Sequence, residues 1–201
     1  MTVVEDIVVK KLGRVDYSST WEGMRAFTRT RDDSTPDELW LLEHPSVYTV
    51  GQGAILSRPV NAIPVVKTDR GGDITYHGPG QAVVYTLVDL GRRSIKVKRF
   101  VWLLEQAVID LLGSRAERKP GAPGVYVDGA KVAALGIRVV RGRAYHGIAL
   151  NVDMDLAPFS AIDPCGYPGL RVTQAKDLGF KHVPGAAAER LAENLATYLD
   201  A

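Results

Sequence analysis

The alternation of hydrophobic and polar positions in the first quarter of the chain predicts a strand, a helix and a pair of short strands. Residues 6–12 are typical of an opening strand, and the polar residues 16–20 can cap a helix that continues through residues 21–31. Residues 37–45 and 46–51 are two short β-rich runs with a probable turn at a His-Pro pair between them.

The middle of the chain predicts one long amphipathic helix over residues 97–113. Its apolar positions repeat at helical spacing, and Gly113 can end it. The positions expected on the buried face are Phe100, Val101, Leu104, Val108 and Leu111.

The remaining sequence predicts an antiparallel meander over residues 121–156 and a closing amphipathic helix over residues 186–200. Two dipeptides, Asp128-Gly129 and Arg141-Gly142, are typical of hairpin turns. Because strands and helices are segregated and do not alternate regularly, the pattern favours an α+β fold with mixed, largely antiparallel sheets over a doubly wound sheet. No long linker interrupts the pattern, so we expect one domain over residues 1–201.

Composition and charge narrow the function. The 201 residues are 46% hydrophobic, and 25 Lys and Arg against 23 Asp and Glu give a formal charge of +2. This balance argues against nucleic acid as a partner. No signal-peptide pattern or membrane-spanning run is visible, which predicts no membrane contact and a cytoplasmic location. The single cysteine excludes an internal disulfide and a multi-cysteine metal site.

The glycine-rich segment "RGGDITYHGPGQ", residues 70–81, matches neither a dinucleotide fingerprint nor a phosphate-binding loop. Its glycines would let the backbone approach a ligand closely around the strand-like "DITYH". A tight irregular loop that leads into a strand, with no ligand, accounts for this segment equally well.

Two further positions carry reactive groups. Cys165 lies in the loop "DPCGYPG", where a partly exposed thiol near a cation could ionise, although an isolated cysteine is usually a small buried hydrophobe. Lys131 opens the apolar run "KVAALGIRV" after a hairpin turn. A solvated amine is the ordinary interpretation, and a partly buried amine that exchanges protons is the alternative. His44, His146 and His182 read as structural.

Taken together, "RGGDITYHGPGQ", "GAKVAALG", "HGIALNV" and "PCG" resemble the lipoyl(octanoyl) transferase family in order and approximate spacing, from about residue 43 to residue 174. Two positions differ from the family pattern: Asp73 replaces a usual glutamine, and a common Thr-Ser reads Thr173-Gln174. The resemblance implies the architecture of biotin and lipoate protein ligases.

The resemblance also implies an activity and a site. Such enzymes move an octanoyl group from the 4′-phosphopantetheine thioester of acyl carrier protein to a lysine of a lipoyl domain, without ATP and through an acyl-cysteine. Cys165 would be the nucleophile and Lys131 its catalytic partner. The residues implied to line the acyl site are Arg70, Gly71, Gly72, Asp73, Ile74, Thr75, Tyr76, His77, Ala134, Leu135, Gly136, Gly147, Ile148 and Ala149.

The acceptors implied are lipoyl domains of 2-oxoacid dehydrogenase E2 subunits and the glycine cleavage H protein, and the expected enzyme is a monomer with no bound cofactor or metal. Residues 91–99, "GRRSIKVKR", carry five cations that either form a solvated helix entry or dock acidic carrier and lipoyl domains. Two rival functions stay open: an ATP-dependent lipoate or biotin protein ligase, and a non-catalytic module that binds lipoyl domains.

Overall fold

The computed structural model describes residues 2–4, 7–53, 61–162 and 169–200. Within them an eight-stranded sheet has the order β1-β2-β3-β7-β11-β10-β9-β8, and a three-stranded sheet has the order β5-β4-β6. The large sheet comprises β1 (Thr2–Val4), β2 (Ile7–Arg14), β3 (Asp37–Glu43), β7 (Gln81–Asp89), β8 (Ala116–Arg118), β9 (Val125–Val127), β10 (Ala130–Val140) and β11 (Arg143–Asn151). The small sheet comprises β4 (Val47–Val50), β5 (Val65–Lys67) and β6 (Ile74–His77).

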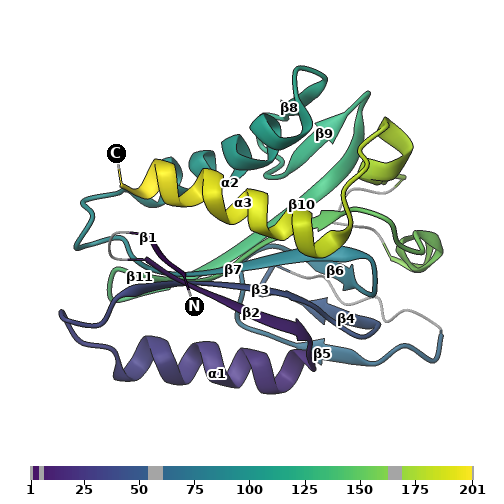
Figure 1. Cartoon of the computed structure of the whole chain (residues 1–201). Coiled ribbons are helices and arrows are strands. Elements are labelled where there is room, and N and C mark those ends of the chain that lie inside the picture. The colour runs from purple at the N-terminus through teal and green to yellow at the C-terminus, as the bar shows by residue number, and fades with distance from the viewer. Residues whose placement is uncertain (1, 5–6, 54–60, 163–168, 201) are drawn as a thin grey trace.

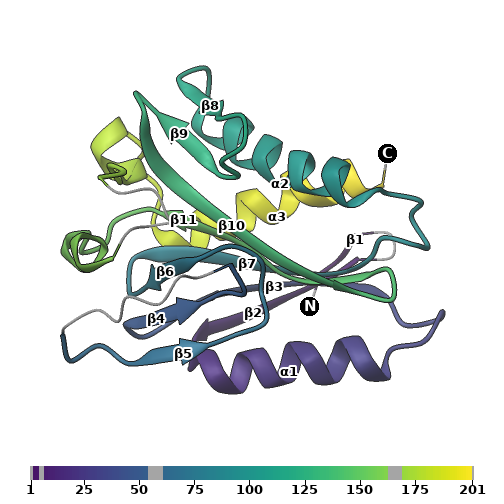
Figure 2. The ribbon, with the colours of Figure 1, turned by 180° about the vertical axis from the view of Figure 1, so that it is seen from behind.

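Helices cover both faces of the large sheet. The helices α2 (Val97–Leu112) and α3 (Pro184–Leu199) lie together on one face, while α1 (Tyr17–Thr30) and the small sheet lie on the other (Figures 1 and 2). One hydrophobic cluster fills the space between the sheet and α2 and α3, and a second lies between the sheet and α1. The α+β class with mixed, largely antiparallel sheets is confirmed, since only β2–β3 and β4–β5 pair in parallel among the named strands.

The predicted helix ends agree with the structure where a specific residue sets them. Asp16 caps α1 by accepting a hydrogen bond from the Ser19 N–H at 2.9 Å, so the helix begins within the polar segment and not after it. Gly113 ends α2 with a φ of 87°. Val101 and Leu111, both expected on the buried face of α2, are only half-buried.

Both predicted hairpin turns are confirmed. Asp128 and Gly129 join β9 to β10, and Arg141 and Gly142 join β10 to β11, with positive φ at all four residues. The central strand β7 was not predicted, because its continuous apolar run lacks the alternation of a half-exposed strand. No helix among the described residues is long and apolar enough to span a membrane.

The first cations of the stretch 91–99 have a structural role. Arg92 and Arg93 bind the carboxylate of Asp37 at 2.8 and 2.5 Å, and Arg31 binds it at 2.6 Å. Asp37 is fully buried at the start of β3, so these arginines neutralise a charge that water cannot reach. Arg93 also donates to the Leu199 carbonyl at the end of α3. These contacts give Arg92 and Arg93 a structural role, and docking through the stretch 91–99 stays a prediction.

Candidate active site

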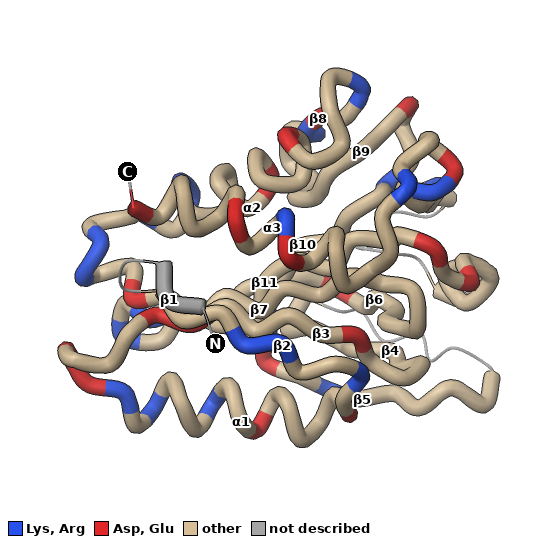
Figure 3. The backbone as a smooth tube through the Cα atoms, viewed as in Figure 1, with Lys and Arg blue, Asp and Glu red and all other residues tan. Residues whose placement is uncertain are grey.

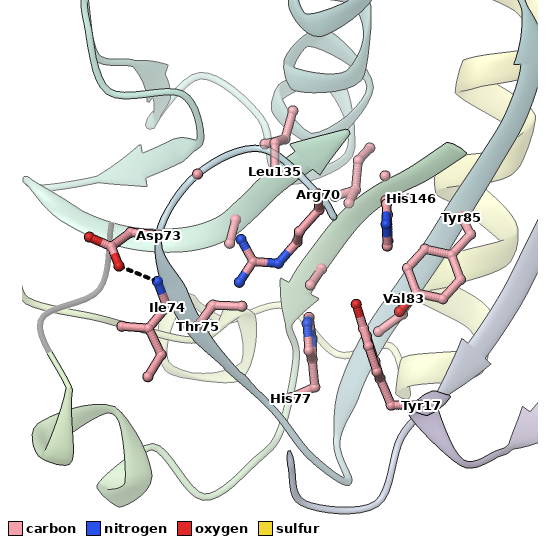
Figure 4. A pocket seen from close by; sticks show the side chains of 16 residues that line it. Tyr17, Arg70, Asp73, Ile74, Thr75, His77, Val83, Tyr85, Leu135 and His146 are labelled. Carbon is pink, nitrogen blue, oxygen red and sulfur yellow. Dashed lines mark hydrogen bonds between the residues drawn. The ribbon is translucent and has the colours of Figure 1, made fainter. Parts of the chain in front are cut away.

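A pocket lies where the small sheet meets β10 and β11, near the start of α1 (Figure 4). Most of the residues predicted for the acyl site line it: Arg70, Gly72, Asp73, Ile74, Thr75, His77, Ala134, Leu135, Gly136, Gly147, Ile148 and Ala149. We call this cavity the acyl pocket. Segments more than 50 residues apart in sequence thus share one cavity because β6, β10 and β11 converge there.

Two predicted residues do not line the acyl pocket. Gly71 donates its N–H to the Ile137 carbonyl at 2.9 Å and faces a neighbouring groove. Tyr76 points into the small core, where its hydroxyl lies 2.9 Å from the Ser46 hydroxyl and its ring packs edge-on against Phe159. Successive side chains of a strand face opposite sides, so Tyr76 faces away from its neighbours Thr75 and His77.

Four lining residues were not among the predicted ones: Tyr17, Val83, Tyr85 and His146. Tyr17 begins α1, and Val83 and Tyr85 belong to β7, so no local motif marks them. His146 is the first residue of the motif "HGIALNV" and was interpreted as structural. Its φ of 63° is visible only in the structure, and a bulky residue adopts that conformation only where its surroundings impose it.

Two glycines of the pocket lining are also required for close packing of the backbone. A Cβ added to Gly147 would lie 2.2 Å from the Val84 carbonyl oxygen on β7. A Cβ added to Gly136 would lie 3.1 Å from both Arg70 Cδ and the Gly71 carbonyl oxygen. The absent side chains therefore let β11 approach β7 and let the loop of residues 70–73 cover β10.

Arg70 fixes that loop over the pocket. Its guanidinium donates to the Thr49 side chain and carbonyl on β4, at 2.6 to 3.1 Å, and to the Gly71 carbonyl at 3.0 Å. Arg70 is 7% exposed, so its charge faces carbonyl and hydroxyl oxygens and not water. Asp73, the departure from the family pattern, accepts the Ile74 N–H at 2.6 Å (Figure 4).

Two buried histidines, His77 of the pocket lining and His44 beside it, are held neutral. Burial lowers the pKa of His77 to about 3 and that of His44 to about 4. The Gln81 amide donates to the Tyr76 carbonyl and to Asn151 Oδ1, so its oxygen accepts from His77 Nδ1 at 2.7 Å. This network assigns the proton of neutral His77 to Nδ1.

His146 is held by Asp69. His146 Nε2 lies 2.9 Å from Asp69 Oδ1, and Asp69 also accepts from the Tyr145 hydroxyl at 2.5 Å and from Trp21 Nε1 at 2.8 Å. Burial acts to raise the pKa of Asp69, but these hydrogen bonds outweigh it and hold that pKa well below the usual range. Burial lowers the pKa of His146, so its ring is neutral, and the hydrogen bond to Asp69 holds its orientation.

Lys131 is buried, in contrast to the ordinary expectation for a lysine after a turn. The residue is 3% exposed. Its Nζ lies 3.2 Å from the Pro123 carbonyl oxygen and 5.2 Å from the centre of the Tyr126 ring. Gly124 makes room for it, because a Cβ there would lie 2.9 Å from Lys131 Cε. Lys131 lies three residues before Ala134, the first residue of β10 that lines the acyl pocket.

Cys165 lies outside the described residues. The chain that follows it is tied to Lys131: the Lys131 N–H donates to the Arg171 carbonyl at 2.8 Å, and the Thr173 N–H donates to the Lys131 carbonyl at 2.9 Å. Lys131 and Val172 form a parallel bridge. Residues 171–173, which follow the cysteine in sequence, thus lie beside Lys131.

A polar chain links this segment to the acyl pocket. Asn151 Nδ2 donates to the Thr173 carbonyl at 3.0 Å, and Asn151 Oδ1 accepts from Gln81, which in turn holds His77. The glycine-rich motif, the end of β11 and the segment after Cys165 are therefore one connected structure. In the part of the chain that the structure describes, no three His, Cys, Asp or Glu residues are placed to hold a metal ion.

The fold and this site define the class of protein. Residues 16–196 match the family described as the lipoyl protein ligase A/B catalytic domain. Two curated relatives, both named octanoyltransferase, are similar over most of their length. That of Aromatoleum aromaticum is 61% identical over 92% of this chain and 82% of its own, and that of Dechloromonas aromatica is 55% identical over 96% and 97%. The chain therefore belongs to the lipoyl(octanoyl) transferase family.

Solved structures show the same architecture at low identity. The bi-partite lipoate protein ligase of Thermoplasma acidophilum aligns with a TM-score of 0.74 at 16% identity, covering 96% of this chain and 83% of its own. The biotin protein ligase of Aquifex aeolicus aligns with a TM-score of 0.53 at 11% identity, covering 98% of this chain and 73% of its own. These likenesses confirm the expected ligase-like fold and carry no statement about substrate.

Proposed function

We propose that this enzyme transfers an octanoyl group from acyl carrier protein to the lysine of a lipoyl domain through a thioester on Cys165, with Lys131 carrying the protons. The observation that carries the proposal is the backbone pairing of the buried Lys131 with residues 171–173, which follow Cys165 in sequence. Family membership supports octanoyl transfer, and the acyl pocket supports an alkyl substrate.

The acyl pocket suits the donor. Its lining is largely apolar, and the small residues Ala134, Gly136, Gly147 and Ala149 leave space along β10 and β11. Burying the seven carbons beyond the octanoyl carbonyl stabilises the complex by roughly 0.8 kcal/mol per methylene. This contribution is large enough to select chain length.

The first half-reaction starts from a Cys165 thiolate beside a Lys131 ammonium, a pairing that favours the nucleophile. The thiolate attacks the donor carbonyl, the carbon–sulfur bond to phosphopantetheine breaks, and a new thioester forms on Cys165. The departing thiolate takes a proton from the Lys131 ammonium, which leaves a neutral amine.

The second half-reaction restores the starting state. The lysine amine of the lipoyl domain attacks the acyl-cysteine, an amide forms, and the carbon–sulfur bond to Cys165 breaks. Neutral Lys131 accepts the proton that the attacking nitrogen loses, so the ammonium and thiolate return together. Neither step consumes ATP, since the donor thioester supplies the activation.

Intact-mass measurement tests this proposal. Octanoyl-carrier protein alone should leave one octanoyl group on the enzyme, mapped to Cys165, and addition of an apo lipoyl domain should move it there as an amide. Cys165→Ser should show no adduct and nearly no transfer, because a hydroxyl stays protonated where a thiol ionises. Transfer that requires ATP and octanoic acid would replace the proposal with a ligase.

A further inference from the structure

A second groove adjoins the acyl pocket. It lies among the loop of residues 70–73, the turn of residues 121–123, Val101 on α2, and Leu135, Gly136 and Ile137 on β10. Four residues line both cavities: Gly72, Asp73, Leu135 and Gly136. We call the second cavity the edge groove.

The edge groove exposes an open stretch of strand edge. β9 pairs with β10 no further than Ala133, and beyond that point the described chain adds one backbone hydrogen bond to this edge, from the Gly71 N–H to the Ile137 carbonyl. The register of β10 with β11 is unbroken from Ala133 to Val140. Polar backbone groups alternate sides along a strand, so the N–H and C=O of Leu135 face the same side as the Ile137 carbonyl. Leu135 therefore offers a donor and an acceptor to the groove.

The edge groove also opens beside the reacting lysine. Pro123 lines it, and the Pro123 carbonyl accepts the hydrogen bond from Lys131 Nζ. Along β10 the four residues from Lys131 to Leu135 span about 13 Å. A chain that starts at the thioester and runs along the edge would reach Leu135.

On this basis we propose that the edge groove binds the pantetheine arm of the acyl donor, with an amide of the arm paired to the Leu135 backbone. This inference rests on the proposed function. The arm is an extended chain that contains two amides, and such a chain can add to an open strand edge as a β-strand does. The acceptor lysine has only methylenes along its side chain and would leave Leu135 unpaired.

The surface beside the groove matches the carrier protein. Val97 and Trp102 on α2 are 46% and 38% exposed, and Arg99 and Arg118 each stack on the Trp102 ring at 4.3 Å. Lys98 adds a further exposed cation. Figure 3 shows cations around β8, the strand that carries Arg118. An apolar centre with cationic neighbours complements an acidic carrier domain.

Donor comparison tests the arm site. Wild-type enzyme should acylate faster with octanoyl-pantetheine than with the octanoyl thioester of propanethiol, which has no amide. Val101→Trp, which fills the groove, should lower kcat/KM for octanoyl-pantetheine about tenfold and leave the propanethiol ester within about twofold. Val101→Ala leaves the groove open and should keep the wild-type preference.

Charge reversal tests the docking surface. Lys98→Glu should lower acylation by octanoyl-carrier protein several-fold, weaken its salt dependence and leave octanoyl-pantetheine unaffected. The matched control is Arg29→Glu, an exposed cation on α1 across the sheet, which should leave both donors unchanged.

Two results would overturn the inference while leaving the proposed function intact. A folded Val101→Trp enzyme that slows octanoyl-pantetheine and the propanethiol ester equally would mean that the groove does not bind the amide-containing arm. If the variant slows only the transfer from preloaded acyl-enzyme to the lipoyl domain, the groove binds the acceptor lysine and not the donor arm. Failure of the proposed function has a different signature: wild-type enzyme would form no acyl adduct with any thioester, carrier protein included.

Discussion

Lys131 donates its backbone N–H to the carbonyl of Arg171 at 2.8 Å, at the end of a segment that begins six residues earlier with Cys165. A buried amine and the chain that follows the only cysteine are thus joined by main-chain bonds, which do not depend on side-chain rotamers. The proposed dyad rests on this backbone frame.

Replacing Lys131 separates its two proposed roles. Lys131→Arg keeps a positive charge but cannot give up a proton near neutral pH, so we expect partial acylation and strongly slowed transfer, with acyl-enzyme accumulating. Lys131→Ala should slow both half-reactions. Single-turnover mass spectrometry of each half-reaction measures this.

The arginine must also fit beside Gly124, where Lys131 Cε already lies close. Circular dichroism and thermal unfolding of each variant serve as the control. A folded Lys131→Arg enzyme with wild-type rates in both steps would remove Lys131 from the proton path.

Asn151 should position the segment after Cys165. Asn151→Ala leaves Gln81 and the Thr173 carbonyl without their partner, at a cost of about 1–3 kcal/mol in the free energy of unfolding. Activity per folded molecule should also fall, and the Thr173 amide should exchange its hydrogen faster. Asn194→Ala, which removes a comparable side-chain bond to the Ala107 carbonyl, should lower stability alone. Equal activities of the two variants would contradict a positioning role for Asn151.

Ala134 should set the acyl chain length. It is partly exposed and faces the acyl pocket, so Ala134→Val adds two methyl-sized groups where the alkyl chain would lie. We expect kcat/KM for octanoyl thioesters to fall about tenfold relative to hexanoyl thioesters, since each buried methylene contributes roughly 0.8 kcal/mol. A series of acyl lengths measured under single-turnover conditions checks this. An unchanged preference would place the chain elsewhere.

Arg93 should be needed for folding and not for docking. Arg93→Glu places a second anion against the buried Asp37, so we expect a loss of about 3–5 kcal/mol in the free energy of unfolding. Urea titration measures the loss, and activity should fall alike for carrier-protein and small-thioester donors. A stable variant that loses only carrier-protein use would support the docking interpretation.

Stability should fall in mild acid because of two buried histidines. His44 and His77 have pKa values lowered to about 4 and about 3, so the unfolded chain takes up their protons first as pH decreases below about 6.5. Each histidine then lowers the free energy of unfolding by about 1.4 kcal/mol per pH unit until its folded pKa is reached. Urea titrations at pH 7, 6 and 5 measure the slope. His44→Gln should reduce it, and an unchanged slope would mean that His44 is not the group that titrates.

The elements that could be predicted from the amino-acid sequence are those with local signals. Asp16 marks the start of α1, Gly113 ends α2, and the two dipeptides at Asp128 and Arg141 fix hairpins, because capping and positive φ depend on one or two residues. The four motifs also predicted the family and most of the pocket lining.

Which side chains contact one another depends on how the elements pack in three dimensions. Tyr17 and Tyr85 line the acyl pocket from α1 and β7. Asp37 binds two arginines that the sequence offered for docking. Lys131 is buried by the turn that contains Pro123 and by the Tyr126 ring on β9. These contacts leave no periodic trace in the chain because they depend on register and packing, which local propensity does not encode.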